Sequence, residues 1–210
     1  AFEEVMAVRG EGMPSDGAVQ ITGEDPVFAT PFKIGETCAA VLGGIGVAVS
    51  DLWQLKTGRA QTCTIDVIDL KNVPEDIPAG MPSVEAGKAS YEAITTAVKL
   101  ALNNEISAIT TAPINKKSLH LAGHPFPGHT ELLGHLTNSP QVALMMAGNT
   151  MRVVLATTHV PLEQVKSHIT QERIQKTIHL THEWLTQHVT AVPNIAVTGL
   201  NPHCGDGGIF

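Results

Sequence analysis

Three short apolar runs, each followed by polar residues and a nearby proline, constrain the fold of this chain most strongly. They span residues 106–109, 151–156 and 195–200. Runs of this length are typical of buried strands, and the helical segments predicted around them indicate an α/β chain with a mostly parallel sheet flanked by helices. In such a sheet, residues at the carboxyl ends of the strands line the ligand crevice. The polar residues after the three runs are therefore the first candidates for a binding site.

Two of these predicted strand ends carry a histidine near a proline, namely His159 and His203. Neutral imidazoles from two strands are a start for a divalent-metal site, which normally has a third ligand and an open position for substrate. Each histidine taken alone is better explained as a strand-end residue bonded to backbone, whereas the same strand-end placement of both, with a proline near each, favours a shared site equally. Two interpretations therefore stay open, a shared site or two unrelated histidines.

Local patterns predict the remaining elements. Apolar residues at helical spacing predict helices over 37–55, 84–103, 115–122, 130–137 and 170–188. Small residues in the first helix favour close packing of its backbone, and Thr130 is expected to cap the fourth. The Gly-Asn-Thr sequence at 148–150 predicts a β-hairpin between 142–147 and 151–156, alternation predicts a half-buried strand over 62–67, and residues 1–33 are expected to be irregular.

Composition narrows the class of protein and of partner. The 210 residues are 43% hydrophobic and 16% charged, with a net charge of −7, which is typical of a soluble protein and argues against nucleic acid or an anionic membrane as partner. We find no signal peptide and no uninterrupted apolar stretch of spanning length. The three cysteines show no C-x-x-C spacing, so a reduced, cytoplasmic compartment is expected.

Four ordered motifs carry a resemblance to a known enzyme family. They are Thr-Ala-Pro-Ile-Asn-Lys at 111–116, Phe-Pro-Gly-His-Thr-Glu at 126–131, Ala-Thr-Thr-His-Val-Pro-Leu at 156–162 and Gly-Leu-Asn-Pro-His-Cys-Gly-Asp-Gly-Gly at 199–208. On these motifs, residues 83–210 resemble the 4-hydroxythreonine-4-phosphate dehydrogenases of pyridoxal phosphate biosynthesis. The resemblance implies a fold similar to part of isocitrate and isopropylmalate dehydrogenase.

The resemblance also implies roles for individual residues. By similarity, His129 and Thr130 bind substrate, and His159 and His203 bind a divalent metal, which is zinc, cobalt, magnesium or manganese. The family's third metal histidine and further substrate residues belong to a later Tyr-His-Asp-Gln motif and its surroundings, which do not occur in these residues. The implied enzyme is a cytoplasmic homodimer that uses NAD or NADP and a divalent metal to oxidise 4-phosphooxy-L-threonine to a 2-amino-3-oxo acid.

A second, shorter resemblance concerns the first part of the chain. Residues 27–67, including the helix that ends at Thr57-Gly58-Arg59, are similar to part of the CaiB/BaiF class III CoA-transferases. That family forms an acyl anhydride on an aspartate, and Glu36 stands at the corresponding position. The resemblance implies acyl-CoA transfer as an alternative function.

The two resemblances together predict a mosaic chain. Residues 1–67 form a transferase-like or divergent segment, 68–82 a proline-rich link, and 83–210 a partial dehydrogenase domain. A folded fragment without activity is a third interpretation. With two of three metal ligands present, we expect weak or no metal occupancy and little or no turnover by these 210 residues alone.

Overall fold

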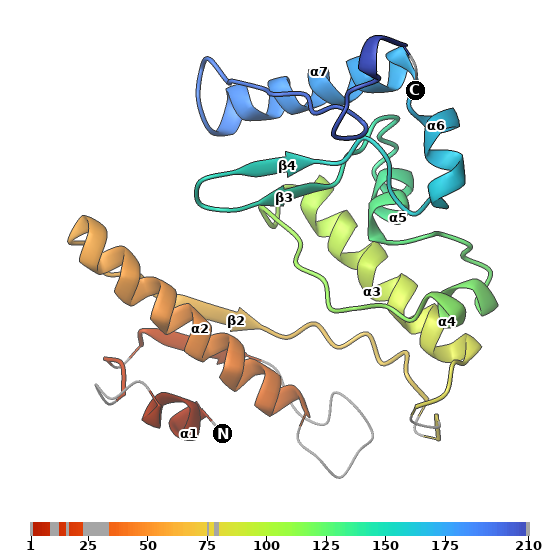
Figure 1. The fold of residues 1–210 in the computed structure, drawn as a ribbon. Helices are drawn as coiled ribbons and strands as arrows, with labels where there is room; N and C mark the ends of the chain where they lie inside the picture. The colour runs from red at the N-terminus through yellow and green to blue at the C-terminus, as the bar shows by residue number, and fades with distance from the viewer. Residues whose placement is uncertain are drawn as a thin grey trace. The chain divides into compact units, whose positions relative to one another are not determined.

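The computed structural model describes residues 2–8, 13–15, 17–22, 34–74, 76–77 and 80–208. The chain divides into two compact units, and each takes two separate stretches of sequence. Unit 1 contains residues 1–96 and 112–124, and unit 2 contains residues 97–111 and 125–210. The long helix α3, Val84–Leu102, belongs to both units because the division falls inside it (Figure 1).

Unit 1 begins with a helix, α1 (Phe2–Ala7), and a parallel pair of strands, β1 (Val19–Thr22) and β2 (Cys63–Asp66). Ile21 lies opposite Ile65 in this pair. The predicted strand over 62–67 is confirmed, with Cys63 and Ile65 half-buried and their neighbours exposed. The expectation of an irregular start is wrong, because β1 forms by pairing with a strand some forty residues later and such pairing leaves no local signal.

Helix α2, Ile34–Thr57, packs on both α1 and the strand pair, and its glycines make this packing possible. A methyl group on Gly44 would lie 2.6 Å from a Val5 side-chain carbon, and one on Gly46 would lie 2.1 Å from the Cys63 sulfur. The prediction that small residues permit close backbone approach in this helix is therefore confirmed. Gly58 ends the helix with φ +73° and donates its N–H to the Gln54 carbonyl.

The first half of α3 packs against a short helix, α4 (Lys116–Leu121), inside unit 1. Asn115 caps α4, because its side-chain oxygen accepts the Ser118 N–H at 2.9 Å. Ser118 in turn accepts the Ser83 N–H at its hydroxyl oxygen, which ties the start of α3 to α4. Ser118 and Leu119 are buried, so this contact is a core of the unit.

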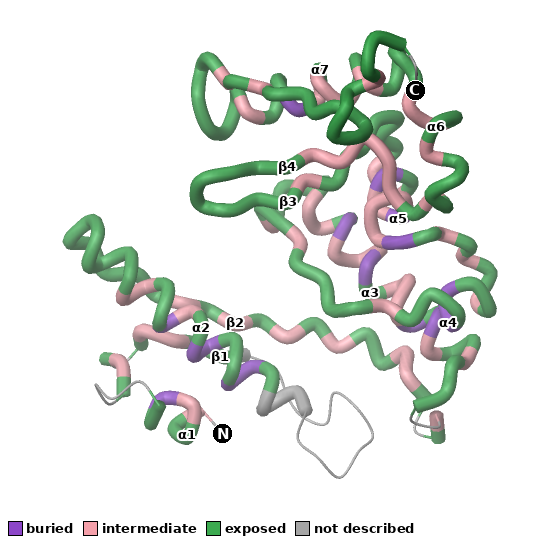
Figure 2. The backbone as a smooth tube through the Cα atoms, in the orientation of Figure 1, coloured by how far each residue is buried: buried purple, intermediate pink, exposed green. Residues whose placement is uncertain are grey.

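Unit 2 contains the predicted hairpin and most of the motif residues. The antiparallel strands β3 (Met145–Ala147) and β4 (Arg152–Val154) confirm the hairpin around Gly148. Its helices are α5 (His129–Leu136), α6 (Val165–His168) and the long α7 (Gln171–His188), with short turns η1 (Leu162–Gln164) and η2 (Asp206–Gly208). Leu132 of α5 is fully buried, and Figure 2 shows how burial varies along the described chain.

The mixed content of helix and sheet agrees with an α/β class, but the predicted strand ends differ from the structure. Within the described residues there are two two-stranded sheets, one parallel and one antiparallel. Residues 106–110 and 195–200 are assigned to no strand, so these two expectations are wrong. An apolar run becomes a strand only when a second strand takes up its backbone hydrogen bonds, and neither run has such a partner among the described residues.

Helix α2 is unusually apolar for a helix with one side exposed. The stretch Cys38–Thr57 is long and apolar enough to cross a membrane, judged by length and composition alone. Core helices of soluble proteins meet the same two conditions, and 28% of this stretch is buried. In the described residues it is the one helix that meets both conditions. The side chain of Glu36, the proposed acyl carrier, lies outside the part of the chain that the structure describes.

Candidate functional site

The Gly-His-Thr-Glu motif forms the start of α5. Gly128 is the residue before the helix and is buried in an extended conformation, with φ −174° and ψ −170°. His129, Thr130 and Glu131 follow as the first three helical residues. The expected cap by Thr130 is wrong, because the helix begins one residue before Thr130 and Gly128 occupies the cap position without any side-chain bond.

Two polar atoms of this helical turn are buried without a hydrogen-bond partner. They are Nε2 of His129 and Oε2 of Glu131. Most buried polar atoms in proteins are hydrogen-bonded, so each exception calls for a specific explanation. A ligand that supplies the missing partners is one such explanation, and it agrees with the substrate-binding role predicted for His129.

The Thr-Thr-His motif approaches the same turn from the segment after β4. A methyl group on Gly128 would lie 3.7 Å from Nε2 of His159 and 3.5 Å from Oε2 of Glu131. The absence of a side chain at Gly128 thus leaves a space that an imidazole and a carboxylate both border. His159 has φ +56°, a left-handed conformation that is uncommon outside glycine and marks this residue for attention.

The last motif lies in a turn between residues 200 and 208. His203 is exposed, and its backbone N–H donates to the Asn201 side-chain oxygen at 2.9 Å. Cys204 and Asp206 have positive φ values of 50° and 40°, so the segment winds tightly. His159 and His203 both belong to unit 2, and their convergence on one metal stays a prediction.

The donor set does not amount to a complete metal shell. Among the residues that the structure describes, no three His, Cys, Asp or Glu side chains come together as a metal site. Divalent metals in proteins normally take at least three protein ligands. The described residues therefore do not supply enough ligands to bind a metal by themselves.

Histidines outside the motifs have ordinary structural explanations. His124 stacks on Tyr91 with ring centroids 3.5 Å apart, and His168 bonds the Gln164 carbonyl at 2.8 Å. His179 lies 3.2 Å from Glu183 one turn further along the exposed face of α7. His179, His182 and His188 are all exposed on α7, as is typical of a solvated helix face.

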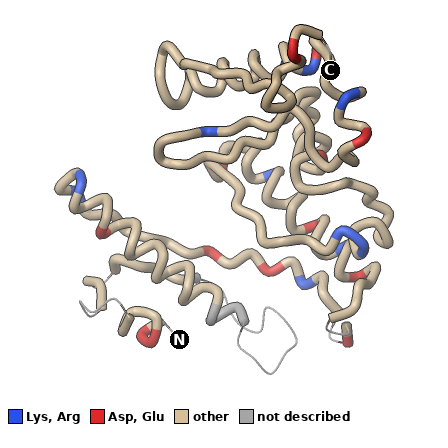
Figure 3. Tube along the Cα trace, in the orientation of Figure 1, with Lys and Arg blue, Asp and Glu red and all other residues tan. Residues whose placement is uncertain are grey.

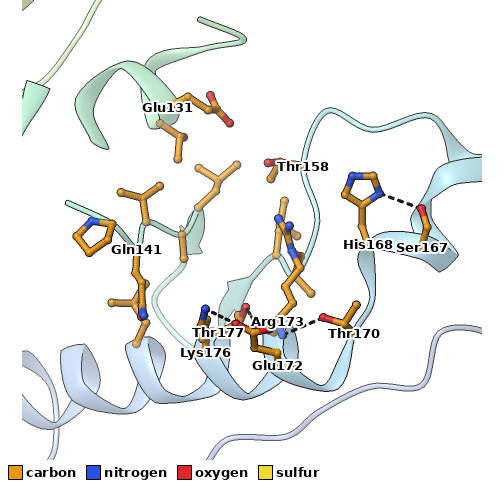
Figure 4. A pocket seen from close by; sticks show the side chains of 18 residues that line it. Glu131, Gln141, Thr158, Ser167, His168, Thr170, Glu172, Arg173, Lys176 and Thr177 are labelled. Carbon is orange, nitrogen blue, oxygen red and sulfur yellow. Dashed lines mark hydrogen bonds and ion pairs between the residues drawn. The ribbon is translucent and has the colours of Figure 1, made fainter. Parts of the chain in front are cut away.

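A pocket of about 550 Å³ lies beside the start of α5 (Figure 4). Thr130 and Glu131 line it from α5, and Thr158 lines it from the Thr-Thr-His motif. Apolar lining comes from the segments around β3 and β4, including Val142, Leu144 and Leu155. The pocket therefore brings two sequence-predicted motifs to one space of a size suited to a small ligand.

Helix α7 closes another side of the pocket with charged residues. Thr170 caps this helix by accepting the Arg173 N–H, and the Arg173 Nε donates to the Ala156 carbonyl at 2.5 Å. Lys176 donates to Glu172 at 2.5 Å, and this hydrogen bond and positive charge lower the pKa of the Glu172 carboxyl below its ordinary value.

The charges around the pocket are balanced. Glu131 and Glu172 oppose Arg173 and Lys176 in the lining, and Figure 3 shows cations and anions interspersed along the described chain. A ligand that carries both a positive and a negative group, or a hydroxyl and an anionic group, matches such a lining. Sequence reasoning missed Arg173 and Lys176, although the spacing of Glu172 and Lys176 by four residues is a recognisable helical ion-pair signal.

Fold and pocket together define a mixed α/β protein with a polar pocket of ligand size. The family described as pyridoxal phosphate biosynthetic protein PdxA matches residues 25–210, and the chain belongs to this family. The D-threonate 4-phosphate dehydrogenase of Cupriavidus necator is 44% identical over 205 residues, which are 95% of this chain and 62% of that protein. The 4-hydroxythreonine-4-phosphate dehydrogenase of Geobacter metallireducens is 46% identical over 185 residues, or 85% of this chain and 55% of its own length.

Solved structures give the same result. The 4-hydroxythreonine-4-phosphate dehydrogenase from Klebsiella pneumoniae matches with a TM-score of 0.64 and 39% identity, over 74% of this chain and 47% of that one. The enzyme of the same name from Burkholderia phymatum matches with a TM-score of 0.59 and 41% identity over the same shares. The chain thus spans about half the length of the solved relatives it matches.

The comparisons do not support the resemblance to CoA-transferases. The family match begins at residue 25 and therefore includes residues 27–67, the segment that carried this resemblance. The Cupriavidus relative likewise aligns over 95% of the chain. Short motifs of small and apolar residues in a packed helix recur in unrelated proteins, so a resemblance over α2 is not specific to one family. The boundaries 1–67, 68–82 and 83–210 stay a prediction.

Proposed function

We propose that this chain serves a dehydrogenase that oxidises a four-carbon, phosphorylated hydroxy acid with NAD or NADP. The first candidate substrate is 4-phosphooxy-L-threonine, which places the reaction in pyridoxal phosphate biosynthesis. One observation carries the proposal: the family motif Gly-His-Thr-Glu lies at a pocket and holds two buried polar atoms without partners, on His129 and Glu131. Such atoms are typical of a site that is completed by its ligand.

The chemistry of the proposed reaction is a two-electron oxidation. The C3 hydroxyl of the substrate loses a proton, its carbon loses a hydride to the nicotinamide, and a 2-amino-3-oxo acid results. His129 and Thr130 hold the substrate at the pocket through their polar atoms. Part of the proposal is that His159 and His203 bind zinc, cobalt, magnesium or manganese, with any further ligand coming from outside the described residues.

A second candidate substrate is favoured by one of the relatives. The Cupriavidus protein, which aligns over the longest stretch described above, is named for D-threonate 4-phosphate. This compound has a hydroxyl group at C2, where 4-phosphooxy-L-threonine has an ammonium group. Both compounds present a donor beside a carboxylate at one end and a phosphate at the other, and both agree with the balanced charge of the pocket.

Further parts of the proposal concern assembly and location. We expect a homodimer in the cytoplasm, with small molecules rather than nucleic acid or membrane as partners. The interspersed positive and negative charges along the described residues support the expectation that nucleic acid is not a partner (Figure 3). Sedimentation of the purified protein at several concentrations tests the assembly.

The direct test of the function is binding and turnover with both compounds. Isothermal titration calorimetry measures binding to the purified chain, and NADH absorbance measures turnover with each metal and with NAD or NADP. We expect His129→Ala to weaken binding, or to raise the KM or lower kcat where turnover is measurable, because a positioned polar contact is lost. His182→Ala, at an exposed position of α7, serves as the matched control. If neither compound binds or reacts, the chain is an inactive fragment and the proposal fails.

A further inference from the structure

Glu131 presents a carboxylate oxygen that the fold itself leaves unused. Its Oε2 is buried and has no hydrogen-bond partner. As the third residue of α5, Glu131 has the position from which a glutamate often accepts the N–H of the residue before the helix. That bond is not among the hydrogen bonds of the described residues. A helix-capping role therefore does not account for the buried oxygen.

The space at Gly128 admits a methyl-sized group next to this buried oxygen. Gly128 has no side chain, and the position of a methyl group there would be 3.5 Å from Glu131 Oε2 and 3.7 Å from His159 Nε2. Glu131 also lines the pocket together with Thr130 and Thr158. In Figure 4 its side chain extends from α5 on the opposite side of the pocket from Glu172 and Lys176. Glu131 thus borders two spaces, the methyl-sized one at Gly128 beside the His159 imidazole and the pocket that Thr130 and Thr158 also line.

We propose that Glu131 is a further substrate-binding residue, whose Oε2 accepts a hydrogen bond from the donor at C2 of the substrate. The donor is an ammonium group in 4-phosphooxy-L-threonine and a hydroxyl group in D-threonate 4-phosphate, and a carboxylate accepts from both. The inference rests on the proposed function and adds to it that the Glu131 carboxylate binds the C2 substituent of the substrate. The cations on α7, Arg173 and Lys176, lie in the same lining and suit the anionic end of either compound.

A ligand-binding role and a structural role of Glu131 predict opposite effects on stability. A carboxylate that stabilises the fold gives a less stable protein when it is replaced. A carboxylate kept for a ligand is an unsatisfied buried acceptor in the unbound protein, so its neutral replacement leaves stability unchanged or raises it. The favourable position of a negative charge at the start of a helix works against this increase, and the isosteric glutamine measures the net effect.

The experiment compares Glu131→Gln with Glu163→Gln in the 210-residue chain. Glu163 lies on η1, is exposed and does not line the pocket, so it controls for the loss of one negative charge. Calorimetry measures binding of 4-phosphooxy-L-threonine and of D-threonate 4-phosphate, and thermal unfolding measures stability.

We expect Glu131→Gln to weaken the binding of at least one compound by about tenfold, with an unchanged or higher Tm, while Glu163→Gln binds like the parent chain. The compound that is weakened more identifies the donor that Glu131 accepts. Binding by Glu131→Gln within twofold of the parent for both compounds overturns the inference and leaves the proposed function standing, and so does a lower Tm with unchanged binding. A parent chain that binds neither compound overturns both.

Discussion

Gly128 is the residue at which the two site motifs meet, and it is buried without being conformationally demanding. Its φ of −174° is extended backbone that any residue adopts, and a methyl group there would make ordinary contacts of 3.5 and 3.7 Å. The value of glycine at this position is therefore the space beside it. That space is bordered by Oε2 of Glu131 and Nε2 of His159.

The substitution Gly128→Ala distinguishes the role of this space in ligand binding from any role of Gly128 in stability. We expect a change of less than about 1 kcal/mol in the free energy of unfolding, since the backbone accepts alanine, but about tenfold weaker binding of the substrate because the methyl group fills the space. Urea denaturation and calorimetry measure the two effects. Gly123→Ala gives the reverse result, with lower stability at φ +85° and unchanged binding. Unaltered binding by Gly128→Ala would show that the ligand does not enter this space.

Asn115 is a residue whose contribution is local and measurable. Its side-chain oxygen satisfies the Ser118 N–H at the start of α4. We expect Asn115→Ala to lower the free energy of unfolding by about 1 kcal/mol, and Asn115→Asp to retain most of it, because aspartate caps helices equally well. Denaturant titration of the three proteins checks this. Equal losses for alanine and aspartate would mean that the cap bond does not contribute.

Short motifs in the sequence indicate candidate site residues, but they do not indicate the burial or the hydrogen bonds of these side chains. His129, Thr130, His159 and His203 were identified from short motifs, and the structure brings the Gly-His-Thr-Glu and Thr-Thr-His segments to one pocket, which Thr130 and Thr158 line. The unpartnered oxygen of Glu131 was not predictable, because burial and the absence of a partner are properties of the packed molecule. The same holds for Arg173, which reaches the Ala156 carbonyl across seventeen residues of sequence.

At the scale of elements, the contact between α3 and α4 is so close that it leaves no room for a larger side chain at Gly87. A methyl group on Gly87 would lie 2.0 Å from the Ser118 carbonyl oxygen and 2.4 Å from its carbon, and both atoms are backbone. Alanine normally favours a helix over glycine by about 1 kcal/mol. Here the two helices approach so closely that the methyl group has no room.

Gly87→Ala should therefore destabilise the protein although it favours the helix. We expect a loss of about 3 kcal/mol in the free energy of unfolding, because backbone atoms of α4 must move. Ala93→Gly, at an exposed position of the same helix, serves as the control for intrinsic preference and should cost about 1 kcal/mol. The prediction is contradicted if Gly87→Ala unfolds at the same urea concentration as the parent chain.

Elements with a strong local signal were predicted well. Five helices begin and end within three residues of their expected bounds, namely α2, α3, α4, α5 and α7. Apolar spacing and capping residues are local signals, because they involve residues that are close together in the sequence. The hairpin was predicted for the same reason. Strand β1 was missed and two expected strands at 106–110 and 195–200 were not found, because strand formation depends on a partner that is distant in sequence.

At the scale of the whole molecule, α2 presents an apolar face with no cover among the described residues. Ile45, Val49 and Leu52 follow one another at helical spacing and are 55%, 58% and 57% exposed. The opposite face of α2 is already packed, with Ala40 and Val47 buried. A helix that is apolar on both faces is typical of one covered on both sides in the assembled protein.

This face should be detectable with an apolar dye. We expect the chain to bind the dye ANS, and the double substitution Ile45→Lys with Val49→Lys to reduce the fluorescence and any self-association, because two charges interrupt the apolar stripe. Fluorescence titration and sedimentation measure these effects. Leu162→Lys, which changes a single exposed leucine on η1, controls for added charge. Dye binding that is the same in all three proteins would place the apolar surface elsewhere.

The division of the chain also determines the order in which its parts can be completed during synthesis. Unit 1 contains residues 112–124, so the ribosome makes residues 97–111 of unit 2 before the α4 segment that packs on Gly87 exists. The first half of α3 then emerges without the partner that covers it. Domains usually fold one after another as they emerge. In this chain, the first unit is complete only after the second has begun, so the two are interleaved in time as well as in sequence.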